Sequence, residues 1–279
     1  MANTITSDIS ALIPAIIAEA MFVAEEASIM RGLVKNFSLG VNNGKTITVP
    51  IYPKQTAAGV AENTDLTSGN VVTSSATLTV SEVGIMTTLT DMAVNSAATN
   101  VVADVGRLFG EAIARKMDQD LTALFDGFSI SVGGATTALT APLVFQAVAK
   151  LRARGVPGSD LFCVVAPEIA YDLKAGLTNT FANPNAGLIQ NAAMATGYVG
   201  MLAGVPVFES SNVLVDTRVS KGGLFHRDAL GLAMMKDISI ELQRDASLRA
   251  TELVATAVYG VGELYDGYGV ELHNQTSLT

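Results

Sequence analysis

The chain has few of the residue types on which most enzymes and secreted domains depend. Its 279 residues include one cysteine, two histidines and no tryptophan, and only 15% are charged. A single cysteine excludes an intrachain disulfide, and the apolar neighbours of Cys163 indicate a buried, inert thiol suited to a reducing compartment. His226 and His273 lie in no nucleophile motif. A catalytic triad is therefore not supported.

Signals for metal and cofactor sites are also missing. The one cysteine and two histidines do not have zinc-site spacing, and no Asp/Asn-rich loop indicates calcium. Residues 259–263 begin like a dinucleotide-binding loop, but the third glycine is absent and no helix pattern follows, so we interpret them as a strand bend. Asp118 and Asp120 fall on a helix face where solvated or salt-bridged carboxylates are usual. We expect no enzyme activity, no cofactor and no metal.

Long hydrophobic runs are absent although 49% of the residues are hydrophobic and the mean hydropathy is +0.39. A membrane-spanning helix needs about 18 or more consecutive apolar residues. The most apolar N-terminal stretch, residues 9–18, contains Pro14 and lacks a basic flank, so neither a transmembrane helix nor an export signal is predicted. The net charge of −9, without a Lys/Arg cluster, argues against nucleic-acid binding as the main role. High apolar content with little charge favours the extended interfaces of a large homo-oligomer.

Hydrophobic periodicity predicts an α+β fold. Residues 1–13 have the composition of an arm, and a helix is predicted from Pro14 onward. The clearest helix covers residues 100–127, about 35 to 40 Å long. Helices at 142–155 and 167–174, with a buried strand at 161–166 between them, indicate an α/β subdomain. The remaining predicted strands cover residues 205–209, 223–226, 230–235, 238–244, 252–259 and 270–273.

A long hairpin is predicted before the main helix. Asn43-Gly44 is typical of a tight turn, residues 46–52 alternate as a strand, residues 53–70 are small and polar, and residues 71–89 form a second strand. The inward-facing set of this second strand shifts near Val83 and Gly84, which suggests a bulge. An isolated two-stranded ribbon is marginal in water, so we infer that a neighbouring subunit covers it.

Four stretches in this order carry a family resemblance. They are Thr-Ile-Thr-Val-Pro at 46–50 followed by Val-Ala-Glu-Asn at 60–63, Ala-Arg-Lys-Met-Asp-Gln-Asp at 114–120, Leu-Ala-Gly-Val-Pro-Val-Phe at 202–208 and Ala-Thr-Ala-Val-Tyr-Gly-Val at 255–261. They resemble the extended loop, the spine helix, the strand leaving the axial domain and a peripheral-domain strand of tailed-phage major capsid proteins, which have the Hong Kong 97 fold. The similarity covers about the whole chain, and the order of the pieces carries it.

The resemblance implies a division of the chain and a function. The parts are an N-terminal arm and helix (1–40), an extended β-hairpin loop (41–90), the long spine helix of the peripheral domain (91–130), an α/β axial domain (131–222) and the β segment of the peripheral domain (223–279). The implied protein self-assembles into pentamers and hexamers of an icosahedral virion capsid enclosing double-stranded DNA, without sequence-specific binding. Assembly in the host cytoplasm is implied.

The resemblance also implies partners and leaves alternatives open. No long charged helical segment precedes the arm, so a separate scaffolding protein is implied, with a portal and a possible decoration protein. The alternative within the same fold is an encapsulin-type compartment of a cell, which a neighbouring terminase or portal gene would distinguish. The alternative from another class is a cytoplasmic α+β enzyme, which a monomer with a deep polar pocket would favour.

Candidate inter-subunit residues fall in three places. The first is the loop, with Lys54 near its base and Glu62, Asn63 and Asp65 further out; no Asn partner for cross-linking Lys54 is identifiable. The second is the turn at 244–249, where Arg244, Asp245 and Arg249 could pair between capsomers or could be a solvated turn. The third is the uncharged stretch 175–208, for which a surface loop that is neutral by chance is the alternative. Because like charges repel around a rotation axis, we expect residues 177–198, with Asn183 and Asn185, near the capsomer axis.

Overall fold

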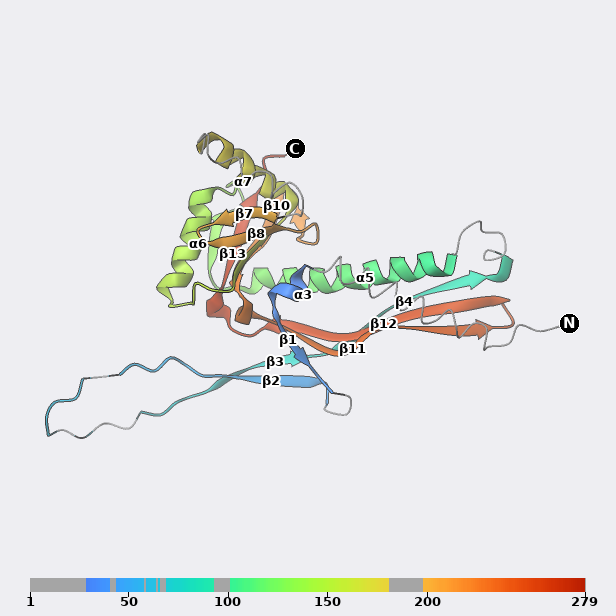
Figure 1. The fold of residues 1–279 in the computed structure, drawn as a ribbon, viewed down its shortest axis with the longest axis horizontal. Helices are drawn as coiled ribbons and strands as arrows, with labels where there is room; N and C mark the ends of the chain where they lie inside the picture. Colours follow the sequence, from blue (N-terminus) through green and yellow to red (C-terminus); the bar gives the residue numbers. More distant parts are fainter. Residues whose placement is uncertain are drawn as a thin grey trace.

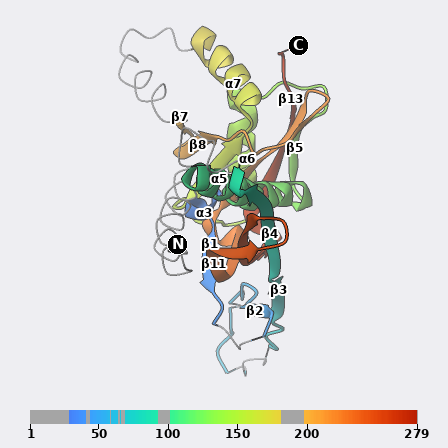
Figure 2. The ribbon, with the colours of Figure 1, turned by 90° about the vertical axis from the view of Figure 1, so that its right-hand side faces the viewer.

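The computed structural model describes residues 29–40, 44–57, 59–63, 65, 69–92, 101–180 and 198–278. They form an elongated α+β molecule in which strands predominate. A long helix, α5, lies between two sheets (Figures 1 and 2). A seven-stranded sheet with two helices stands on one side of α5, and a four-stranded sheet runs beneath it. A two-stranded hairpin carries a loop that extends away from the body (Figure 1).

Helix α5 covers Val101–Ala123 and continues as the 3₁₀ turn η1, Leu124–Gly127. Its buried apolar side chains recur every four residues at Phe109, Ile113, Met117 and Leu121, which places them on one stripe. The helix predicted at 100–127 is thereby confirmed, with a tighter last turn. Phe125 in η1 packs on Phe225 with ring centroids 5.4 Å apart, which joins the helix to the seven-stranded sheet.

The four-stranded sheet has the order β1-β11-β12-β4. Its strands are β1 (Lys35–Ser38), β11 (Leu230–Asp245), β12 (Ala250–Glu263) and β4 (Ser81–Thr90), and the short helix α3 (Met30–Leu33) precedes β1. Only β1 and β11 run parallel, whereas the other neighbours are antiparallel. The separate strands predicted at 230–235 and 238–244 form one strand, β11, with register shifts on either side of Lys236.

The bulge predicted near Val83 and Gly84 is wrong. Strand β4 pairs with β12 without interruption from Ser81 to Thr90. The shift in the inward-facing set has another cause: the predicted strand is two strands in different sheets, divided at Val80. The amide of Val80 donates a hydrogen bond to the Lys45 carbonyl at 2.9 Å, and the chain then leaves the hairpin for the four-stranded sheet.

The seven-stranded sheet has the order β5-β13-β10-β6-β8-β7, and β9 pairs with β10. Its strands are β5 (Ser131–Gly134), β6 (Leu161–Val165), β7 (Tyr198–Leu202), β8 (Val205–Glu209), β9 (Val215–Asp216), β10 (Val219–His226) and β13 (Gly269–Gln275), and its helices are α6 (Ala141–Ala153) and α7 (Pro167–Thr180). The division placed at residue 222 therefore falls inside β10, and β13 returns to this sheet from the C-terminal end of the chain.

The hairpin consists of β2 (Thr46–Ile51) and β3 (Ser74–Thr79), paired from Thr46 with Thr79 to Ile51 with Ser74. A small hydrophobic cluster, separate from the main core, attaches it to the four-stranded sheet. The cluster contains Leu39, Leu78, Val80, Ala233 and Leu264. Residues 259–263, interpreted above as a strand bend, lie at the end of β12. A Cβ on Gly260 would lie 2.2 Å from the Thr79 carbonyl oxygen, so glycine is what allows β3 to cross β12 this closely.

Glu263, at the end of β12, is predicted to make stability depend on pH. Partial burial, with a smaller effect from nearby Asp266, raises the pKa of Glu263 above its ordinary value of 4.5. The folded state therefore favours the protonated carboxyl, and its stability decreases as pH rises from 4.5 through the raised pKa. We expect Glu263→Gln to raise the Tm at pH 7 by about 1–2 °C and to change it less at pH 4. Equal shifts at both pH values, or in the exposed control Glu82→Gln at pH 7, would contradict this.

Candidate assembly surfaces

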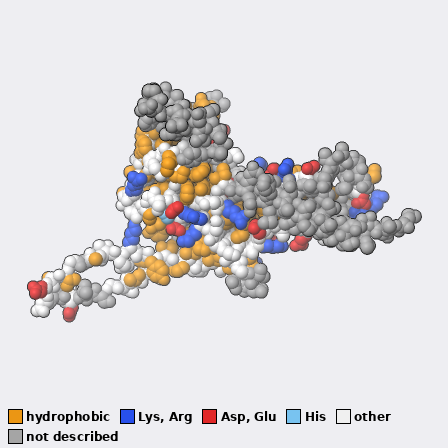
Figure 3. Space-filling view, in the orientation of Figure 1, with side chains coloured by type: hydrophobic (Ala, Val, Ile, Leu, Met, Phe, Trp, Pro, Cys, Tyr) orange, Lys and Arg blue, Asp and Glu red, His pale blue; other side chains and the backbone are white. Residues whose placement is uncertain are grey.

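The described residues between β2 and β3, which we call the extended loop (residues 52–73), are all exposed. The hairpin ladder ends at Ile51 and Ser74, so the loop has no strand pairing of its own. Glu62, Asn63 and Asp65 lie in its outer part, and the sequence contains no Lys or Arg between residues 55 and 106. The far end of the loop is acidic on the face shown in Figure 3. The outer part of the loop is thus an exposed acidic segment.

Lys54 differs from the other candidate loop residues because it contacts the body of its own chain. Its Nζ donates hydrogen bonds to the carbonyl oxygens of Arg154 at 2.8 Å and Gly155 at 3.0 Å, just after α6. The ammonium group that was expected to face another subunit is therefore bound within the subunit. No local sequence signal could have predicted this contact, since its partners are about a hundred positions away.

At the far end of the four-stranded sheet, two of the three candidate residues are bound within the chain. Arg244 donates to both carboxylate oxygens of Asp91 at 2.6 and 2.7 Å, and this pairing holds the pKa of Asp91 below its ordinary value. Asp245 accepts hydrogen bonds from Ser247 and the Leu248 amide, which lower its pKa in the same way. Arg244 and Asp245 therefore stabilise the end of the sheet through contacts within the chain.

Arg249, the third candidate at this end, is exposed and adopts a left-handed backbone conformation with φ of 49°. Its guanidinium forms no ion pair or hydrogen bond with the parts of the chain that the structure describes, although Asp91 lies close enough to feel its charge. Leu248 beside it is 60% exposed, and Met92 at the end of β4 is 79% exposed. A free cation next to exposed apolar side chains suits contact with another protein. Asn183, Asn185 and most of the predicted axis segment lie outside the described residues.

A buried polar site on α5 was not predicted. Asp118, expected to be solvated or salt-bridged at the surface, is 0% exposed. Its Oδ2 accepts hydrogen bonds from the Ile29 amide at 3.1 Å and from Nδ2 of Asn212 at 3.4 Å. The sequence did contain a signal, because Asp118 follows Ala114 by one turn and lies between the buried Met117 and Leu121. The site ties the segment before β1 and the turn after β8 to the C-terminal half of α5.

Asp120, the neighbouring carboxylate, lies nearer the surface as expected and links α5 to β12. It pairs with Lys116 one turn earlier and accepts a hydrogen bond from the Tyr259 hydroxyl at 2.8 Å. Burial, together with the charge of Asp120, raises the pKa of the Tyr259 hydroxyl well above its ordinary value. The tyrosine therefore stays protonated and acts as a structural donor.

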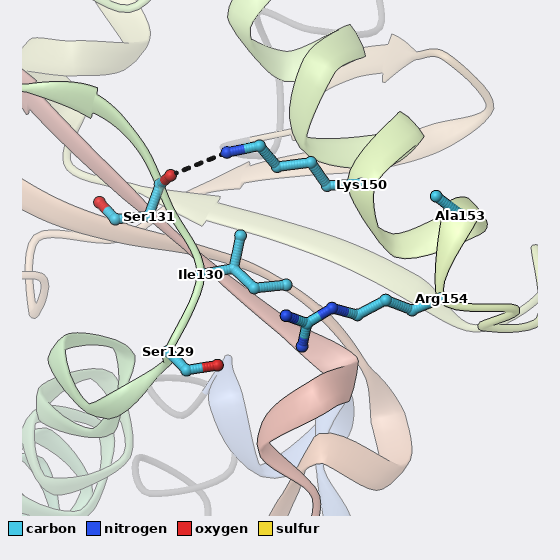
Figure 4. Close-up of a pocket in the computed structure, with 6 residues that line it drawn as sticks. All are labelled: Ser129, Ile130, Ser131, Lys150, Ala153 and Arg154. Atoms are coloured by element: carbon cyan, nitrogen blue, oxygen red, sulfur yellow. Dashed lines mark hydrogen bonds between the residues drawn. The ribbon is translucent and has the colours of Figure 1, made fainter. Parts of the chain in front are cut away.

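A surface hollow of about 480 Å³ lies between α6 and β5 (Figure 4). It is lined by Ser129, Ile130, Ser131, Lys150, Ala153 and Arg154. Lys150 donates to the Ser131 carbonyl at 3.1 Å, and the lining offers two hydroxyls and two cations but no imidazole, thiol or carboxylate. This lining contains no pairing of a nucleophile with a base. The hollow therefore gives no support to catalysis.

Among the residues that the structure describes, no group of three or more His, Cys, Asp or Glu side chains could hold a metal ion. None of the described helices is both long enough and apolar enough to cross a membrane.

Comparisons with known proteins place the chain. A family model described as phage capsid protein matches residues 73–270. A comparison with curated proteins found no significant match. Among solved structures, the chain is similar to the capsid of the cyanophage P-SCSP1u, with a TM-score of 0.72, 18% identity and coverage of 90% of this chain and 89% of the other. It is also similar to a chain of Mycobacterium phage Che8, with a TM-score of 0.70, 20% identity and coverage of 88% and 90%.

A third similar structure is the head of Helicobacter pylori bacteriophage KHP40, with a TM-score of 0.69, 12% identity and coverage of 90% of this chain and 91% of the other. At these identities the three structures show a shared fold, which is the mixed α+β phage capsid fold with a majority of strands. The family model covers more than half of the chain and therefore shows which family the chain belongs to. The chain therefore belongs to the phage capsid protein family, as its resemblance to tailed-phage major capsid proteins predicted, and is a structural protein of the virion shell and not an enzyme.

Proposed function

We propose that this chain forms pentamers and hexamers whose subunits interlock through their extended loops to make an icosahedral shell around double-stranded DNA. The observation that carries the proposal is the loop itself, which is exposed in all its described residues and projects from a protein of a shell-forming family. A short isolated hairpin that carries an unpaired loop is marginal in water and gains stability when another subunit covers it. Glu62, Asn63 and Asp65 are the loop residues that would meet the adjacent subunit.

Each part of the subunit would correspond to one region of the capsid fold. Helix α5 would be the spine of a peripheral domain completed by β4, β11 and β12. The seven-stranded sheet with α6 and α7 would be the axial domain, including β10 and β13. Residues 1–40 would supply the N-terminal arm. With a net charge of −9, the chain would enclose DNA without sequence-specific binding. A separate scaffolding protein, a portal and a possible decoration protein would complete assembly in the host cytoplasm.

The direct test is negative-stain electron microscopy of the purified protein, expressed alone and with a candidate scaffolding protein. The proposal predicts capsomer rings and closed shells. A folded protein that stays monomeric under both conditions would overturn it.

Arg249 is predicted to contact another capsomer. Its guanidinium has no partner in the described part of the chain, and it stands beside exposed Leu248. We expect Arg249→Glu to reduce the yield of closed shells at least about tenfold while capsomers still form, because reversal turns attraction into repulsion at every symmetry-related copy. Shell and capsomer yields can be compared on sucrose gradients. Lys236→Glu, at an exposed position of β11 in the same sheet, is the control, and normal yields from Arg249→Glu would reject the contact.

Residues 177–198 are proposed to lie near the capsomer axis, on the ground that residues 175–208 contain no charge. Asn183→Asp and Asn185→Asp would each place five or six like charges around the ring. Rings should then be less stable, and more so at low salt, because screening is weaker there. Electron micrographs at two salt concentrations would measure this. Normal shells from both variants at low salt would exclude an axial position.

A further inference from the structure

Lys54 joins the base of the extended loop to the end of α6. The chain leaves β2 at Ile51, and three residues later the Lys54 side chain reaches two carbonyl oxygens just beyond that helix. Among the described loop residues, Lys54 makes the only side-chain hydrogen bonds to the rest of the chain. The other attachment of the hairpin is the small hydrophobic cluster around Leu78, which lies near the opposite end of the ladder, where Thr46 pairs with Thr79.

The end of α6 is well suited to receive a cation. The Gly155 amide bonds to the Arg152 carbonyl at 2.8 Å and the Val156 amide to the Leu151 carbonyl at 3.2 Å, which is the pattern of a glycine-terminated helix. This closure leaves the carbonyl oxygens of Arg154 and Gly155 pointing outward, at the negative end of the helix dipole. A Cβ on Gly155 would lie 2.7 Å from Nζ of Lys54, so the glycine also provides the space that the ammonium occupies.

Because the loop is long, a small change of angle at its base displaces its end by a large distance. From Ile51 to Glu62 an extended chain covers about 35 Å. A rotation of about 10° at the base would therefore move the acidic end by about 6 Å, twice the length of a hydrogen bond. A contact that sets the angle at the base therefore controls which residues of another molecule the end of the loop can reach.

We propose that Lys54 is a positioning residue that sets the direction of the extended loop by binding the C-terminal carbonyls of α6, so that the loop meets its site on a second copy of the chain. This role rests on the proposed function for its consequence in assembly, but the orientation itself is a property of the single subunit. Lys54 thus acts within its own chain and promotes contacts made by residues further along the loop.

The orientation can be measured in the free subunit with two spin labels, one on Ala61→Cys in the loop and one on Gln146→Cys, exposed on α6. The native Cys163 does not interfere, because it is buried and burial raises its pKa to about 12. Double electron-electron resonance then gives the distance distribution between loop and helix. Lys54→Ala is compared with Lys54→Arg, which keeps a cationic donor, and with Lys45→Ala, which removes an exposed lysine from the hairpin's other end.

Lys54→Ala is expected to increase the population of orientations away from α6 by about two- to fivefold. Lys54→Arg and Lys45→Ala should keep the narrow distribution of the wild type. All variants should unfold at the same temperature, which separates orientation from stability. An unchanged distribution in Lys54→Ala, or equal broadening in Lys45→Ala, would overturn the proposal.

Shell formation by unlabelled protein tests the consequence. Lys54→Ala should require a protein concentration about two- to fivefold higher for half-maximal assembly, whereas Lys54→Arg should assemble like the wild type. If the wild type forms shells and Lys54→Ala matches it, the positioning role in assembly is rejected. If the wild type forms no shells, the proposed function fails, and the distance measurement still decides whether Lys54 orients the loop.

Discussion

Replacing Asp118 by alanine is expected to lower the free energy of unfolding by about 2–4 kcal/mol. The side chain is fully buried and accepts hydrogen bonds from the Ile29 amide and from Asn212. Alanine would leave two partly buried donors without this acceptor, and an unsatisfied donor costs up to about 1–3 kcal/mol when it is fully buried. Loss of the buried charge offsets part of that cost, because desolvating a carboxylate is itself unfavourable.

Urea denaturation of the unassembled subunit measures this effect. Asp118→Asn keeps one carbonyl oxygen of the same shape and should lose less stability than the alanine variant. Glu111→Ala, exposed on the same helix, should stay within about 0.5 kcal/mol of the wild type. Hydrogen exchange should accelerate first in residues 29–39, since Ile29 lies at the start of that segment. An alanine variant as stable as Glu111→Ala would show that the buried site contributes nothing.

Replacing Gly260 by alanine is expected to cost about 1–3 kcal/mol and to loosen the hairpin on the sheet. The added Cβ would lie 2.2 Å from the Thr79 carbonyl oxygen and 3.0 Å from Cα of Val80. Both are backbone atoms, so no side chain can turn aside to make room. The junction between β3 and β4 must move, which separates Leu78 and Val80 from their hydrophobic cluster.

The matched control is Gly158→Ala, because a Cβ at Gly158 meets nothing within 4 Å. Denaturation should place this control within about 0.5 kcal/mol of the wild type. Hydrogen exchange in β2 and β3 should increase in Gly260→Ala and not in the control. Equal stability of the two variants would mean that the crossing of β3 over β12 relaxes without cost.

Gly260 and Lys54 both fix the position of the hairpin and its loop on the body of the subunit, but through different contacts. Gly260 allows apolar contact between the hairpin and the sheet, whereas Lys54 provides a polar contact between the loop and α6. Loss of the first should change both stability and loop orientation, and loss of the second should change orientation alone. Measuring both quantities on both variants separates the two roles.

Local patterns in the sequence predicted the elements whose burial is periodic along the chain. The four-residue repeat from Phe109 to Leu121 is sufficient to predict α5, because apolar residues at this spacing lie along one face of a helix and that face packs on the core. The break between β3 and β4 was misread as a bulge, since a change of sheet and a bulge both shift the inward set by one residue. Strand β1 was missed, because its four residues pair with β11 almost 200 positions later and have no alternation of their own.

The sequence by itself determined the class of protein: low charge and high apolar content favoured a large homo-oligomer, and four stretches in a fixed order carried the resemblance to tailed-phage major capsid proteins. The family model then confirmed it. Only the tertiary structure decided which charged residues are available to neighbours. Arg244, Asp245 and Lys54 have partners within the chain, and Asp118 is buried, whereas Arg249 stays free in the described part of the chain. The reason is physical: a charged side chain interacts strongly only with groups within a few ångströms. Which groups lie that close depends on the fold and not on separation along the chain.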